Sequence, residues 1–201
     1  MAIESLQKLV VEQLRDLYDA EKRLTKALPK LAKKASNEEL RSALESHLAE
    51  TEEQVGRLEQ CFEIMDEPAR GKACAGMQGI IEEANEHVGE DYDDDGLRDA
   101  VIIGAAQKSE HYEIAAYGTV ATHAKLLGQH DVLKLLLATL EEEKAADEKL
   151  TAIAKGVVNP DAASEDDDRE HQRSAAARAG AARQSSPRGN GKSNGRASRA
   201  R

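Results

Sequence analysis

The chain has 201 residues, a formal net charge of −10 and only 2% aromatic residues, none of them Trp. So few aromatics exclude a nucleic-acid reader that stacks bases on aromatic side chains, and they argue against a β-sandwich or β-barrel. A core of Leu, Ala, Ile and Val favours helices instead, and the length suits one domain with a sizeable core.

Two long helices are predicted at the start of the chain, where apolar residues recur with helical periodicity. The first is expected over residues 3–35, with a kink at Pro29. Ser36 or Asn37 can cap the second helix, which should end near Met65.

The middle of the chain predicts a short helix over 73–88 and an acidic turn over 91–96. Two more long helices are predicted over 97–127 and 131–156. Four long helices with one long connection between the second and the third indicate an all-α four-helix bundle with a crossover, and the short fifth helix lies in that crossover.

The composition changes after residue 160, where Leu, Ile and Val no longer occur. We therefore predict a bundle domain over 1–160 and a disordered tail over 161–201, because such a tail can bury little apolar surface. Residues 171–201 hold eight bases and no acid, whereas 1–170 carry a charge of −18. We interpret this tail either as an arm that binds DNA phosphates or as a solubilising extension.

The location of the protein is inferred from missing signals. The N-terminal residues lack the pattern of a signal peptide, and no apolar stretch is long enough to span a bilayer, so we expect a cytoplasmic protein without a membrane partner. Cys61 and Cys74 are expected to be reduced packing residues, and they do not form the pattern of a zinc site.

Carboxylates occupy positions where a helical bundle normally places apolar residues. In the first helix, Glu21 interrupts the apolar seam of Leu14, Leu17, Leu24 and Leu28. One such acid alone would be explained by a salt bridge or a helix boundary. Acids interrupt or border the seams of all the other long helices too: Glu50, Glu110, Glu113, Glu143 and Asp147.

These six acids are predicted to converge in one layer. Each lies roughly 20–30 Å along its helix from the nearest predicted helix–helix turn, at 1.5 Å per residue. No Lys or Arg occupies the same seam positions. Because unpaired buried charge costs several kcal/mol per ion, two multivalent cations are the expected compensation, and oxygen-rich sites suit iron or manganese.

The chain resembles the YciE/YciF family of ferritin-like proteins over roughly residues 3–158. The matching segments, in order, are LYDAEKRLTKALPKLA (17–32), HLAETEEQ (47–54), CAGMQGIIEEANE (74–86), AAQKSEHYEIAAYGT (105–119) and LEEEKAADEKL (140–150). The resemblance implies a ferritin-like bundle and a dinuclear site of two iron ions, or manganese, carried by the six acids above.

The expected ligand set departs from the commoner ferritin-like pattern, which has Glu-x-x-His on two helices. Here the second helix has His47-x-x-Glu50 with Gln54, and the fourth has Glu143 followed by Asp147. We include His47 and Gln54 among the candidate metal residues, although His47 could equally support a ligand or be a satisfied core histidine.

The resemblance implies a ferroxidase or peroxide-detoxifying activity in a stress response, with dioxygen or peroxide as the oxidant. A homodimer is the expected assembly. The alternative is a non-catalytic stress protein, or a nucleoid-associated protein that binds DNA through residues 171–201. Tyr18 and Tyr112, which neighbour predicted ligands, are expected to pack in the core or to hydrogen-bond carboxylates.

Overall fold

The computed structural model of the chain describes residues 3–164, and these residues form helices joined by short connections. Most of the predicted tail, including all of 171–201, lies outside the described residues. The elements are α1 (Leu6–Lys34), α2 (Glu38–Ile64), α3 (Ala75–His87), α4 (Asp95–Leu126), α5 (His130–Ile153) and a π-helical turn, η1 (Ala154–Val158). Within 3–164 there is no strand, which confirms the predicted all-α class.

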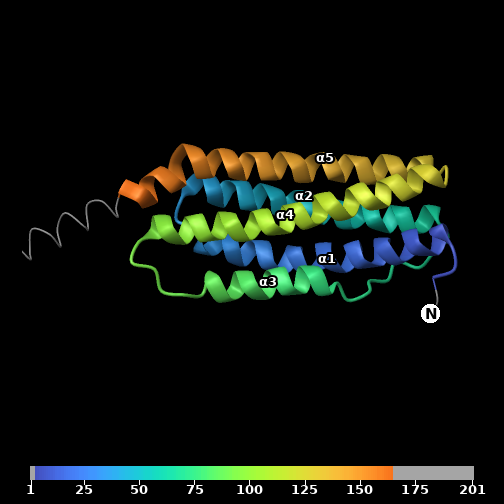
Figure 1. Cartoon of the computed structure of the whole chain (residues 1–201), viewed down its shortest axis with the longest axis horizontal. Helices are drawn as coiled ribbons and strands as arrows, with labels where there is room; N and C mark the ends of the chain where they lie inside the picture. Colours follow the sequence, from blue (N-terminus) through green and yellow to red (C-terminus); the bar gives the residue numbers. More distant parts are fainter. Residues whose placement is uncertain (1–2, 165–201) are drawn as a thin grey trace, which may run out of the picture. The chain divides into compact units, whose positions relative to one another are not determined.

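The four long helices form two antiparallel hairpins, α1–α2 and α4–α5, that pack side by side (Figure 1). Around the bundle, α1 contacts α2 and α4, and α5 contacts the same two helices. The connection from α2 to α4 runs back along the bundle and carries α3, which packs against α1 and α4 (Figure 1). The predicted four-helix bundle with a helical crossover is therefore confirmed.

Side-chain caps explain where several helices begin. Asn37, rather than Ser36, caps α2, because its Oδ1 accepts a hydrogen bond from the Leu40 N–H at 3.0 Å. Asp94 caps α4 in the same way, so this helix begins inside the predicted acidic turn. The first helix continues through Pro29, where we predicted a kink.

The last long helix changes its hydrogen-bonding pattern near its end. We predicted a continuous helix to residue 156, but the α-helix ends at Ile153 and widens into the π-helical turn η1. Helical backbone then resumes over 159–164, and Val158 and Ala162 are buried against the bundle. No helix in the described part of the chain is long and apolar enough to cross a membrane.

The core consists of two apolar clusters separated by a polar layer. The Leu28 cluster lies at the α1–α2 turn, and the Leu14 cluster lies at the other end of the bundle. Between them all four long helices contribute buried polar side chains, which we call the polar layer: Glu21, His47, Gln54, Glu110, Glu113 and Glu143. Of the six acids predicted to converge, Glu21, Glu110, Glu113 and Glu143 are buried in this layer, whereas Glu50 and Asp147 are only partly buried.

One further buried acid joins the two hairpins at the end of the bundle. Asp99 of α4 is 3% exposed. Its carboxylate accepts hydrogen bonds from the backbone N–H groups of Ser36 and Asn37, at 2.9 and 2.7 Å. These contacts satisfy donors at the N-terminus of α2 and attach the α1–α2 turn to α4.

Candidate metal centre

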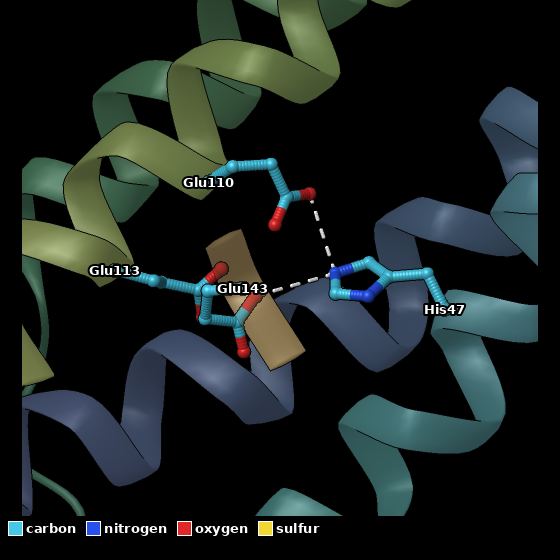
Figure 2. A group of neighbouring side chains, drawn as sticks. All are labelled: His47, Glu110, Glu113 and Glu143. Atoms are coloured by element: carbon cyan, nitrogen blue, oxygen red, sulfur yellow. Dashed lines mark ion pairs between the residues drawn. The ribbon is translucent and has the colours of Figure 1, made fainter. Parts of the chain in front are cut away.

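Four side chains of the polar layer meet in one buried group, which we call the His47 cluster. His47 comes from α2, Glu110 and Glu113 from α4, and Glu143 from α5, and their side chains point toward one another (Figure 2). One ligand atom from each lies within 4.8 Å of those of the others. The exposed fraction is 6% for His47 and at most 1% for the three glutamates.

The imidazole of His47 lies between carboxylates on both sides of the ring. Its Nε2 is 3.3 Å from Glu110 Oε1 and 3.7 Å from Glu143 Oε2. Its Nδ1 is 3.3 Å from Glu50 Oε2. Among residues 3–164, His47 is thus the only side chain able to carry a positive charge that contacts the carboxylates of the cluster.

The carboxylates of the layer also approach one another. Glu21 lies within hydrogen-bonding reach of Glu113, and Glu110 within reach of Glu143. Two ionised carboxylates cannot satisfy such a contact, because each can only accept. Six buried carboxylate oxygens of these four residues receive no hydrogen bond from a protein donor.

Burial and mutual repulsion shift the pKa values of this group. Burial raises the pKa of Glu21 to about 7, although a hydrogen bond from Tyr117 acts in the opposite direction. Burial, together with the charges of neighbouring glutamates, raises the pKa of Glu113 and Glu143 well above the ordinary value. Burial alone would lower the pKa of His47, but its contacts with Glu110 and Glu50 raise it to about 9.

The buried donor atoms of the His47 cluster fit a metal ion. A buried unpartnered carboxylate oxygen is costly, and it is rare in native proteins unless water or an ion satisfies it. Three carboxylates and one imidazole that converge within coordination range form a donor set that metal ions bind. The His47 cluster is therefore compatible with a metal site.

Glu21, on α1, belongs to the polar layer but not to the His47 cluster. It is fully buried, and its Oε1 accepts a hydrogen bond from the Tyr117 hydroxyl at 2.5 Å. We did not predict a functional role for Tyr117 from the sequence. Its position offered a signal, since it follows Glu113 by four residues and so lies on the same face of α4.

Three other predicted ligands lie outside the cluster. The side chain of Glu50 is 44% exposed, and its Oε2 lies 3.3 Å from Nδ1 of His47. Asp147 Oδ1 accepts a hydrogen bond from Gln107 at 2.9 Å and lies 3.4 Å from His111 Nε2, which is on the exposed side of α4. Gln54 is fully buried, but its amide donates to Glu142 at 3.2 Å.

Two tyrosines bind carboxylates away from the cluster. The Tyr18 hydroxyl donates to Glu59 at 2.7 Å, and the Tyr112 hydroxyl donates to Asp16 at 2.6 Å. Cys74, whose Sγ lies 2.9 Å from the Tyr112 hydroxyl, is free and buried, and so is Cys61. Both cysteines are free and buried, as predicted, and Cys74 also caps α3 by accepting from the Met77 N–H.

Comparison with known proteins places the chain among relatives with the same fold. The sequence model of a family described as "Domain of unknown function (DUF892)" matches residues 5–163. The chain is 48% identical over 160 residues to Protein YciF of Escherichia coli strain K12. The aligned region covers 79% of this chain and 96% of the relative.

Solved structures agree with this likeness. The structure described as the E. coli stress protein YciF superposes with a TM-score of 0.74 at 48% identity, over 78% of this chain and 99% of that one. YcfI from Rhodopseudomonas palustris, which its description presents as a candidate structural protein, has a TM-score of 0.74 at 43% identity, over 76% and 96% of the two chains. A protein from Xanthomonas campestris, 21% identical with a TM-score of 0.64 over 81% and 99%, shares the fold.

Proposed function

The chain belongs to the DUF892 family, and we propose that it is a stress-response protein that binds iron in the polar layer and oxidises it. Manganese is the alternative metal, since carboxylate-rich sites suit both. The stress role is suggested by the E. coli relative, whose structure is described as that of a stress protein.

One observation carries the proposal: six buried carboxylate oxygens on Glu21, Glu110, Glu113 and Glu143 have no protein donor. A bundle that needed only stability would place apolar residues at these seam positions. Two cations held between the four carboxylates would neutralise charges that His47 alone cannot balance.

Bound iron would supply one-electron redox chemistry. As substrate, two Fe²⁺ ions each give up one electron, so that with two protons they reduce one hydrogen peroxide to two waters. The protein residues provide the surroundings for this reaction. Buried carboxylates stabilise the higher charge of the oxidised ions, and burial limits the access of water. Tyr117 holds the Glu21 carboxylate in one orientation.

The test measures anaerobic Fe²⁺ binding by calorimetry and then Fe²⁺ oxidation after peroxide or air is added. We expect Glu143→Gln to weaken binding by at least about tenfold, since even residues that only support ligands have effects of that size. Glu148→Gln, an exposed site on the same helix, is the matched control. Wild-type protein that binds neither iron nor manganese would refute the proposal, and binding without oxidation would leave a metal-binding protein that is not an oxidase.

The alternative function, DNA binding through residues 171–201, stays a prediction, as does a homodimer. A salt-dependent shift of DNA in a gel that is lost on deletion of 171–201 would support the DNA-binding arm. Unchanged mobility of DNA with the full chain would reject it. Sedimentation of the full chain would measure its oligomeric state.

A further inference from the structure

A cavity of about 140 Å³ leads to the His47 cluster from the surface between α2 and α5. His47 and Glu110, both buried, line its inner end, and Glu110 has one buried oxygen without a hydrogen-bond partner. Exposed residues, among them Ser46 and Lys149, lie at its outer end. The cavity therefore leads from solvent to His47 and Glu110 of the His47 cluster.

Small residues form the walls of this cavity. Ala43, Ala145 and Ala146 line it, and Leu44 and Leu150 complete its apolar surface. Because the passage is narrow, an added side-chain branch on α5 would occupy a large part of it. Its volume suits an ion with a few waters, dioxygen or peroxide.

The outer end carries charges with different partners. Glu142 lines the cavity, but Arg57 binds it through two N–H groups, at 2.5 and 2.7 Å, so its charge is compensated. Glu50 is half-exposed, and its carboxylate lies 3.3 Å from the imidazole of His47. Glu50 thus offers a carboxylate to solvent on one side and reaches a candidate ligand on the other.

We propose that this cavity is the route by which a divalent metal ion reaches and leaves the centre, with Glu50 as the carboxylate that attracts the ion at the mouth. The inference rests on the proposed metal function. Glu50 was predicted to be a permanent ligand, and the inference instead places its role at the mouth of the cavity. Lys149 lies at the same mouth and repels a cation, so the balance between the charges of Glu50 and Lys149 sets the rate of metal exchange.

The first experiment blocks the passage and separates rate from affinity. Protein loaded with Fe²⁺ under anaerobic conditions is mixed with a coloured Fe²⁺ chelator, which reports the release rate, and competition with the chelator gives the affinity. We expect Ala146→Leu to slow release and uptake by about tenfold or more, with an affinity within about twofold of wild type. Ala145→Leu, at an exposed wall position, is the second variant if the first folds poorly.

The matched control is Ala138→Leu, which adds the same atoms at an exposed site of α5 outside the cavity. It should exchange iron at the wild-type rate. Wild-type rates in both wall variants would overturn the inference while the metal function stands. A wild-type protein that holds no Fe²⁺ would overturn both.

The second experiment tests the charges at the mouth. Glu50→Gln, which keeps a polar group beside His47 Nδ1, should slow uptake several-fold and change the affinity by less than it changes the uptake rate. Lys149→Gln should accelerate both uptake and release. The two effects should shrink in high salt, because exposed charges are screened. If Glu50→Gln instead weakens affinity and accelerates release, Glu50 is a ligand of the bound ion and its role at the mouth is wrong.

Discussion

The two apolar clusters and the polar layer between them follow opposite principles within one bundle. In the Leu14 cluster, buried side chains such as Leu14 and Leu136 gain stability by leaving water. In the polar layer, Glu113 and Glu143 are buried to the same extent without protein donors. The difference indicates that the ends of the bundle hold the fold together, whereas the middle carries a buried donor set that is compatible with a metal site.

The largest effect is expected from a truncation in an apolar cluster. Leu14→Ala removes a fully buried side chain and should lower the free energy of unfolding by about 2–5 kcal/mol. Chemical denaturation of the metal-free protein measures this change. A loss well below this range would mean that the Leu14 cluster is loosely packed and that the contrast with the polar layer is weaker than described.

A substitution in the polar layer should act in the opposite direction. Glu113→Gln replaces a carboxyl group whose pKa is raised by burial with an amide that stays neutral and donates to Glu21, so the metal-free protein should gain about 1–3 kcal/mol at pH values where Glu113 would ionise. The same variant should lose the rise in melting temperature that Fe²⁺ or Mn²⁺ gives the wild type. Loss of stability in the metal-free variant would show that the layer is structural.

The pH dependence of stability should come mainly from the polar layer. The pKa of Glu21 is raised to about 7 and that of His47 to about 9, so the folded chain binds more protons than the unfolded chain between the ordinary and the raised values. Stability of the metal-free protein should therefore fall as pH rises from about 5 to about 9. Melting temperatures in the presence of a chelator test this.

Metal should reverse this trend, because metal ions compete with protons for the same groups. The stabilisation by Mn²⁺ is expected to increase over the same pH range. A metal-free stability that rises toward pH 9 would contradict the raised pKa values.

The smallest effect on metal binding is expected at Asp147, which lies outside the His47 cluster. Asp147→Asn should leave the affinity for Fe²⁺ within about twofold and cost about 0.5–1.5 kcal/mol of stability through its contact with Gln107. Calorimetry checks the affinity. A loss as large as that of Glu143→Gln would show that Asp147 moves into the centre when metal binds.

Much of the fold followed from local patterns in the sequence. The helices, the crossover and the level of the polar layer depend on periodicity, turn residues and the rise of 1.5 Å per residue, all of which are local. Glu21, Glu110 and Glu113 interrupt apolar seams, and a seam fixes the face that a helix buries. Their burial could therefore be predicted.

The membership of the His47 cluster depends on how each helix is rotated and where its neighbours lie. Glu50 borders a seam rather than interrupting it, and the rotation of α2 leaves it half-exposed while His47 is buried. Gln54 lies seven residues from His47, about 10 Å along α2, and meets Glu142 instead. Such differences of one side chain arise from packing between helices, which no single-helix pattern contains.

The contact of Asp99 with the α1–α2 turn has a consequence for the distant centre. Along α4, Glu110 lies about 16 Å from Asp99, and along α2, His47 lies about 15 Å from Asn37, at 1.5 Å per residue. Sliding α4 by one residue along α2 would shift its side chains by 1.5 Å, whereas metal–ligand distances tolerate only about 0.2 Å. Two backbone hydrogen bonds to one carboxylate thus help to set the axial register of the hairpins, and with it the spacing of the candidate ligands three helical turns away.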